Sequence, residues 1–197
     1  TRAEIDVTWK CHHSMIIDNV SDFTHAFLHR KYQPFVDSKL TKVDERDDKV
    51  YVHYETKVGR GKISGLFVDR SRVDTEQMDL CYHYPYQCSN TGDAIKHWLF
   101  VLPIDERTTR AFFIFYFKPL KVPFLPVSIP KPLMVPLMAI SNEVLIKPLL
   151  DEDRRAVEAE QEGYEEHFAQ PIAELSPAVH AFQELTVRKW QAYLDRE

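Results

Sequence analysis

The amino-acid sequence changes from strand-like alternation in its first 117 residues to helical periodicity after residue 151. Apolar and polar residues alternate at 5–9 and 49–58, which is the pattern of a half-buried strand. Gly59 and Gly61 then separate residues 49–58 from an apolar run at 63–68, so these two segments predict a hairpin. The first part of the chain therefore predicts a sheet.

Further strands are expected before residue 118. Residues 78–88 form a strand candidate that Pro85 restricts to an edge or a bulge. Two apolar runs at 97–102 and 111–117 are joined by a short polar connection, as in a hairpin. A short helix is expected at 20–29, ahead of most of these strands. Together these segments predict a twisted antiparallel sheet.

The last third of the chain predicts helices. Residues 153–167 are rich in Ala, Glu, Gln and Arg, and residues 177–194 carry apolar residues at helical spacing. Ser176 followed by Pro177 is a favourable helix start. A sheet followed by helices places the chain in the α+β class.

A proline-rich segment at 118–150 separates the two parts. Seven of the twelve prolines fall there, among Leu, Val, Ile and Met, so we expect regular structure to be broken. This segment could cap the entrance of a site, touch a membrane surface through its lysines and apolar residues, or form a buried irregular connection. The sequence leaves these alternatives open.

Composition excludes several classes of protein. With 197 residues and 44% hydrophobic content, the chain predicts one domain with a substantial core. A net charge of −5 and the absence of long like-charge runs argue against nucleic-acid binding. The three cysteines form no Cys-x-x-Cys pair and no 18-residue apolar run occurs, so neither a cysteine-rich zinc site nor a transmembrane helix is predicted. A cytoplasmic or plastid-like compartment is expected.

Asp22, His25 and His29 are the first candidates for metal chemistry. On a helix, these positions at i, i+3 and i+7 lie along one face, where two imidazoles one turn apart can reach the same ion. The histidine spacing alone is not specific, because such pairs also arise by chance. The surrounding residues decide the interpretation.

Two separated motifs give the sequence a family resemblance. Asn19, Asp22, His25 and His29 match the pattern Asn-x-x-Asp-x-x-His-x(3 or 4)-His, and residues 152–161 match Glu-Asp-x(4)-Glu-Ala-x-Gln. In this order, the motifs resemble the mononuclear iron site of the Rieske-type non-haem iron, aromatic-ring-hydroxylating oxygenases, in the catalytic C-terminal domain of the alpha subunit. The general style is similar to the pheophorbide a oxygenase-like branch. The resemblance covers nearly the whole chain.

The resemblance implies a fold and a site. The fold would be a helix-grip (START/Bet v1-like), in which an antiparallel sheet wraps a long C-terminal helix. His25, His29 and Asp153 would ligate Fe(II), a set that leaves positions open for dioxygen and an adjacent substrate. Asp22 would accept a hydrogen bond from a ligand histidine and link it to a cluster histidine of a neighbouring subunit. Asn19 is assigned to the same site by its place in the motif.

The sequence departs from the family at the iron–sulfur cluster. A Rieske [2Fe-2S] cluster requires Cys-x-His and Cys-x-x-His, and neither pattern occurs here. Residues 1–197 are therefore interpreted as a single catalytic mononuclear-iron domain. The cluster domain is expected to precede Thr1, with a separate electron-donor protein as the alternative.

The resemblance also implies partners and a reaction. Electrons from NAD(P)H would arrive through a reductase or ferredoxin, and O2 would be used to hydroxylate or oxidatively demethylate a small organic substrate, aromatic or large and apolar. A cyclic homotrimer is expected, with each site completed across an interface. Two other classes remain open: a zinc-dependent hydrolase that uses the same histidines, and a non-enzymatic helix-grip domain that binds a hydrophobic ligand. The identity of the substrate cannot be read from the sequence.

Overall fold

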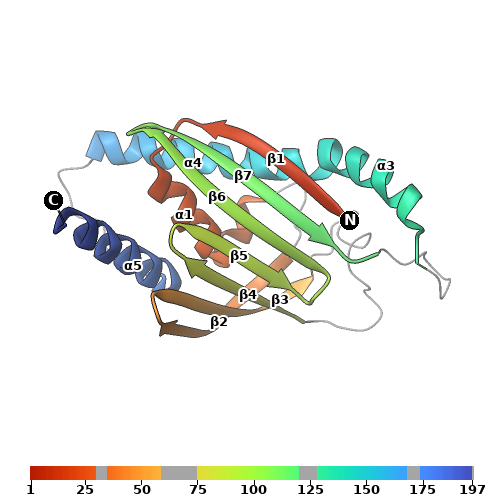
Figure 1. The fold of residues 1–197 in the computed structure, drawn as a ribbon, viewed down its shortest axis with the longest axis horizontal. Coiled ribbons are helices and arrows are strands. Elements are labelled where there is room, and N and C mark those ends of the chain that lie inside the picture. Colours follow the sequence, from red (N-terminus) through yellow and green to blue (C-terminus); the bar gives the residue numbers. More distant parts are fainter. Residues whose placement is uncertain (30–34, 59–74, 120–127, 168–173, 197) are drawn as a thin grey trace.

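The computed structural model describes residues 1–29, 35–58, 75–119, 128–167 and 174–196 (Figure 1). Seven antiparallel strands form one sheet in the order β1-β7-β6-β5-β4-β3-β2. The strands are β1 (Arg2–Trp9), β2 (Phe35–Arg46), β3 (Lys49–Val58), β4 (Glu76–His83), β5 (Tyr86–Thr91), β6 (Ile95–Asp105) and β7 (Thr108–Phe117). The helices are α1 (His13–Ser21), η1 (Phe23–Leu28), α3 (Lys131–Ser141), η2 (Asn142–Ile146), α4 (Lys147–His167) and α5 (Pro177–Leu194).

The helices lie on one face of the sheet, as Figure 1 shows for α1, α4 and α5. Strand alternation produces this arrangement, because every second side chain of β1 and β7 is buried or partly buried against the helices while its neighbours face outward. The predicted α+β helix-grip architecture is confirmed. The predicted hairpin of the 97–102 and 111–117 runs is also confirmed, as the paired strands β6 and β7.

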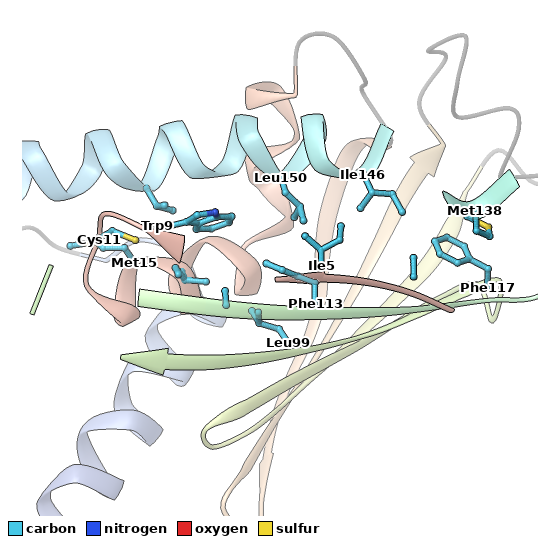
Figure 2. Close-up of a cluster of buried hydrophobic side chains, with 14 of the residues drawn as sticks. Ile5, Trp9, Cys11, Met15, Leu99, Phe113, Phe117, Met138, Ile146 and Leu150 are labelled. Carbon is cyan, nitrogen blue, oxygen red and sulfur yellow. The ribbon is translucent and has the colours of Figure 1, made fainter. Parts of the chain in front are cut away.

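Two hydrophobic clusters fill the space between the sheet and the helices. One joins Ile5, Leu99 and Phe113 of the sheet to Ile146 and Leu150, which Figure 2 shows on the helix above the strands. The second cluster joins β3 and β4 to α1 and α5, and its buried members are Ile17, Phe23, Val50, Val52, Tyr54, Met78, Leu80, Tyr82, Ala178, Ala181, Phe182 and Leu185. The helices α4 and α5 thus cover different halves of the sheet.

The predicted short helix at 20–29 is wrong in its boundaries. The α1 helix ends at Ser21, Asp22 adopts an extended conformation with φ −104° and ψ 96°, and a 3-10 helix follows. The break is stable because the Asp22 carboxylate accepts the backbone N–H of Thr24 at the start of η1. His25 and His29 therefore do not continue the α1 helix.

Two strand predictions also need correction. The candidate strand at 78–88 is divided into β4 and β5, which turn back on each other at Tyr84 and Pro85 because proline lacks the N–H that a continuing ladder needs. In the described residues β3 pairs with β4 on one side and with β2, which the sequence did not reveal, on the other. The run at 63–68 lies outside the described residues.

The prediction that residues 118–150 lack regular structure is wrong for 131–150. Lys131–Ser141 is an α-helix, and a π-helical turn, Asn142–Ile146, continues it into α4. Pro132 occupies the first turn, where no N–H bond is required, and Pro148 follows the irregular π-turn. Residues 120–127 lie outside the described part.

The joined helix Lys131–His167 is long and apolar enough to cross a membrane by length and composition, the one such helix in the described ranges. In this fold its residues Met134, Met138, Leu150 and Val157 are buried in the cluster that includes the sheet residues Ile5 and Leu99. One face of this helix therefore packs into the core, whereas other apolar side chains of its first part are more than half exposed: Leu133, Val135, Ile140 and Val144.

Candidate metal centre

A capped 3-10 helix presents His25. The two carboxylate oxygens of Asp22 accept the backbone N–H of Thr24 at 2.8 Å and its hydroxyl at 2.9 Å, which fixes the start of η1. One turn later, the Nδ1 atom of the His25 ring contacts the backbone carbonyl oxygen of Asp22. This contact requires a proton on Nδ1, so Nε2 carries the free lone pair. The Nε2 atom lies 3.6 Å from Oδ1 of Asp153.

His29 reaches the same carboxylate from the end of η1. Its side chain is almost fully buried, with Nε2 at 3.4 Å from Oδ1 of Asp153. Its other ring nitrogen, Nδ1, lies 3.3 Å from Oε2 of Glu152. Glu152 can therefore hold the His29 proton on Nδ1 and direct Nε2 toward Asp153.

The α4 helix places Asp153 in the interior. Leu150, Asp153, Val157 and Gln161 are its buried residues, at the spacing of one helix face. Oε1 of Gln161 accepts the backbone N–H of His12 at 2.8 Å, and Oε1 of Glu158 accepts that of Lys10 at 2.9 Å. Glu158 and Gln161 of the second motif therefore hydrogen-bond α4 to the segment after β1. These bonds fix the position of Asp153.

Asp153 is a buried carboxylate with an unused oxygen. Its Oδ1 has no hydrogen-bond partner among the described residues, although the side chain bonds to Asn19 of α1. A buried acceptor without a donor lowers the stability of the folded protein, and a cation bound to this oxygen would offset that loss. One ligand atom each of His25, His29 and Asp153 lies within 4.8 Å of the others.

The electrostatics of these groups match a metal site. Burial raises the pKa of Asp153 to about 8, with the nearby charge of Glu152 adding to the rise and the Asn19 hydrogen bond opposing it. Burial lowers the pKa of His25 and that of His29 to about 4 each, so both imidazoles are neutral at pH 7. Two neutral imidazole nitrogens and one carboxylate oxygen form a donor set that suits Fe(II), and such sets also bind Zn²⁺.

The structure brings together most of the residues that the sequence singled out. His25, His29 and Asp153 converge, and Asn19 contacts Asp153. The half-buried Asp22 caps η1 with its carboxylate, and its backbone oxygen rather than its carboxylate contacts His25. The sequence assigned no role to Glu152 beyond its place in the second motif, because its contact with His29 joins residues 123 positions apart.

The remaining histidines that were given no role lie elsewhere. His83, His167 and His180 are exposed, and Nδ1 of His53 forms a surface pair with Asp79 at 2.7 Å. His97 is held by two polar neighbours on the covered face of the sheet. None of these five histidines lies at the candidate metal centre.

Sequence comparison relates the chain to oxygenases. Residues 9–197 match the family described as vanillate O-demethylase oxygenase C-terminal domain. The chain is 44% identical over 189 residues to a 4β-methylsterol monooxygenase of Methylococcus capsulatus (strain ATCC 33009 / NCIMB 11132 / Bath), which covers 96% of this chain and 51% of that protein. The chain thus spans about half the length of this curated relative.

Structural comparison finds the same fold in distant proteins. A quaternary ammonium Rieske monooxygenase superposes with a TM-score of 0.63 at 14% identity, over 94% of this chain and 49% of the other. Dicamba monooxygenase superposes with a TM-score of 0.63 at 15% identity, over 100% and 58% of the two chains. The ZhuI aromatase/cyclase of Streptomyces sp. R1128 gives 0.53 at 12% identity, over 83% and 94%. At these identities the likeness shows the shared fold alone.

Proposed function

We propose a function from the premise that this chain belongs to the vanillate O-demethylase oxygenase C-terminal domain family, the catalytic domain of Rieske-type oxygenases. The proposed function is oxygenation of an organic substrate at a mononuclear iron site formed by His25, His29 and Asp153. One observation carries this proposal: the three side chains predicted from two distant motifs converge on a buried point in a chain of this family. Fe(II) bound there would supply dioxygen activation, because two imidazoles and one carboxylate leave coordination positions open.

The protein residues hold the ligand atoms in place. The backbone oxygen of Asp22 and the carboxylate of Glu152 each keep an imidazole in the tautomer that points Nε2 inward. Asn19 orients the Asp153 carboxylate. The ring of Phe35 lies 6.2 Å from that of His29, and that of Phe23 lies 6.3 Å from that of His25, so apolar groups border the site and limit the access of water.

The overall reaction requires an electron supply from outside this chain. Insertion of one oxygen atom of O2 into a C–H bond gives an alcohol, and reduction of the other atom to water consumes two electrons and two protons. We assign the electrons to NAD(P)H, delivered by a reductase or ferredoxin through a Rieske [2Fe-2S] cluster on another domain. The relative at 44% identity is named for methylsterols, so we propose a large apolar substrate of this kind.

Replacement of His25 by Ala in the full-length protein tests the proposal. The variant should lose stoichiometric iron after anaerobic reconstitution, and also substrate-dependent O2 consumption, because one of three ligands is removed. His180→Ala, which changes an exposed histidine of α5, is the matched control and should retain both. Iron content and turnover that survive in His25→Ala would contradict the assignment, as would a wild-type protein that binds only zinc and catalyses hydrolysis.

A further inference from the structure

Three polar side chains, two of them buried and one partly buried, form a cluster on the covered face of the sheet. Ser89 of β5 lies opposite His97 of β6, and Oγ of Ser89 is 2.6 Å from Nδ1 of His97. The other ring nitrogen, Nε2, is 3.0 Å from Oε1 of Gln87. Gln87 is only 2% exposed, yet its Nε2 has no hydrogen-bond partner among the described residues.

The Gln87 amide is the end of this hydrogen-bond chain at which one polar atom has no partner among the described residues. When the Ser89 hydroxyl donates to Nδ1 of His97, Nε2–H donates to Oε1 of Gln87, and the two N–H groups of the Gln87 amide remain unused. If the amide is turned around, the chain of donors reverses and the amide oxygen remains unused instead. In either arrangement a buried amide atom lacks a partner, which is unfavourable without a ligand.

Gln87 lies on the covered face of the sheet, between residues of the two hydrophobic clusters. Gln87 lies opposite Leu99 across the β5–β6 pair, and Leu99 belongs to the same hydrophobic cluster as Leu150. Leu150 projects from the helix toward the strands in Figure 2 and precedes Asp153 by one helical turn. On its other side, Gln87 lies opposite the buried Tyr82. The Gln87 amide is thus surrounded by apolar side chains, on the face of the sheet that the helices and the candidate metal centre cover.

In the described strands β6 and β7, the charged side chains next to the cluster point away from it. Lys96 and Arg110 of the adjoining strands β6 and β7 are exposed and alternate to the opposite face from His97 and Leu99. Burial lowers the pKa of His97 to about 4, so its imidazole is neutral at pH 7. Nothing in this cluster would neutralise a carboxylate, sulfate or quaternary ammonium group.

We propose that Gln87, supported by His97 and Ser89, binds an uncharged hydroxyl or keto oxygen of an otherwise apolar substrate. This inference rests on the proposed function, for which it specifies the substrate class. Anchoring this one oxygen would determine which carbon of the substrate is presented to His25, His29 and Asp153. His97 and Ser89 are positioning residues, because they act on the substrate only through the Gln87 amide.

Equilibrium binding to the full-length protein tests the anchor with three probes: a 4-methylsterol with a 3-hydroxyl group, its 3-deoxy analogue and its 3-sulfate ester. Wild-type protein should bind the hydroxysterol more tightly than either analogue. Gln87→Leu should weaken hydroxysterol binding by about 3- to 10-fold, as expected for one neutral hydrogen bond, and leave the affinity for the deoxysterol unchanged. The unchanged deoxysterol affinity also shows that the variant is folded, and Gln87→Met provides a second apolar replacement.

Gln77→Leu is the matched control, because Gln77 is an exposed glutamine of the adjacent strand β4. It should bind all three probes like the wild type. The proposal that Gln87 binds the sterol oxygen would be contradicted by a wild-type protein without preference for the hydroxysterol. Gln87 variants that keep this preference would also contradict it.

Iron content and turnover, measured on the same samples, separate the two proposals. A Gln87→Leu protein with wild-type sterol preference, full iron and normal turnover overturns the anchor and leaves the oxygenase function standing. A sterol preference that depends on Gln87, in a wild-type protein that binds no iron and shows no turnover, supports the anchor and contradicts the oxygenase function.

Discussion

Asp153 determines how the metal centre behaves at the scale of single residues. Burial raises the pKa of Asp153 from its ordinary value of 3.8 to about 8, so ionisation of Asp153 is unfavourable in the folded, metal-free protein. A bound divalent cation reverses this preference, because it favours the carboxylate over the protonated acid. The same residue therefore destabilises the empty protein at alkaline pH and stabilises the metal-bound one.

The pH window for this effect follows from the signs of the shifts. A carboxyl with a raised pKa contributes stability below its unfolded pKa, near 3.8, and this contribution is lost as the pH rises through about 8. The lowered pKa values of His25 and His29 act at lower pH, since their contribution is present above 6.5 and lost as the pH falls through about 4. Between pH 6.5 and 8, Asp153 is thus the one of these three residues whose titration makes the stability of the folded protein depend on pH.

We predict that metal-free Asp153→Asn has a higher Tm than the metal-free wild type at pH 8. The difference between the two Tm values should become smaller toward pH 6.5. Thermal unfolding of both proteins in chelator, across this range, measures the effect. Asp18, whose pKa burial raises to about 7, contributes in both proteins and cancels in the comparison. Added Fe(II) should raise the Tm of the wild type alone.

Glu162→Gln, at an exposed position of α4, is the control and should show the wild-type pH dependence. A difference between Asp153→Asn and wild type that stays constant from pH 6.5 to 8 would show that Asp153 does not titrate in this window.

At the scale of elements, β6 shows how alternation positions the site. Leu99 is fully buried and faces the helices, whereas Leu102, three residues later, is 51% exposed on the other side. The sheet therefore presents one packed face and one open face, and Gln87, Ser89 and His97 belong to the packed one. A shift of one residue in the register of β6 would exchange these faces.

We predict that Leu99→Ala lowers the free energy of unfolding by about 2 to 5 kcal/mol, because it leaves a cavity between β6 and the helices. Leu102→Ala removes the same atoms from the open face and should cost no more than about 0.5 kcal/mol. Urea denaturation of the two variants measures both values. Equal losses would show that the side chains do not face opposite sides of β6.

At the scale of the whole molecule, Asp22 connects this chain to the parts outside it. The Asp22 side chain is partly exposed, and its backbone oxygen rather than its carboxylate contacts His25, so a neighbouring domain could reach the carboxylate without disturbing the ligands. We propose that the cluster domain of an adjacent protomer docks there in a cyclic homotrimer. Asparagine is also a good helix cap, so Asp22→Asn changes the charge while it preserves η1.

We predict that Asp22→Asn in the full-length protein keeps its iron and its trimeric mass by analytical ultracentrifugation, but loses at least about 10-fold in turnover. Single-turnover kinetics with a pre-reduced cluster should show slowed electron transfer. Asp195→Asn, at the exposed end of α5, is the control and should turn over normally. Loss of iron from Asp22→Asn, with normal electron transfer in the metallated fraction, would instead make Asp22 a ligand.

The sequence alone determined the parts of the protein that depend on local pattern. Alternation at 49–58, 97–102 and 111–117 and helical periodicity at 177–194 correctly predicted strands and a helix, because each pattern reflects burial of one face within one element. The candidate ligands were also found from sequence, through the resemblance of two short motifs to a known family. Strand β2 was missed since its burial pattern is irregular and its turn uses Asp47 and Asp48 at positive φ, without the usual glycine.

Only the tertiary structure decided which side chains meet. The contact of His29 with Glu152 spans 123 residues, and Asp153 has an unused oxygen only because α4 buries it against α1 and η1. The cluster of Gln87, Ser89 and His97 exists because the β5–β6 register sets them on one face, which no spacing in the sequence specifies. Such contacts depend on strand register and helix placement, which are fixed by packing of the whole core rather than by any local segment.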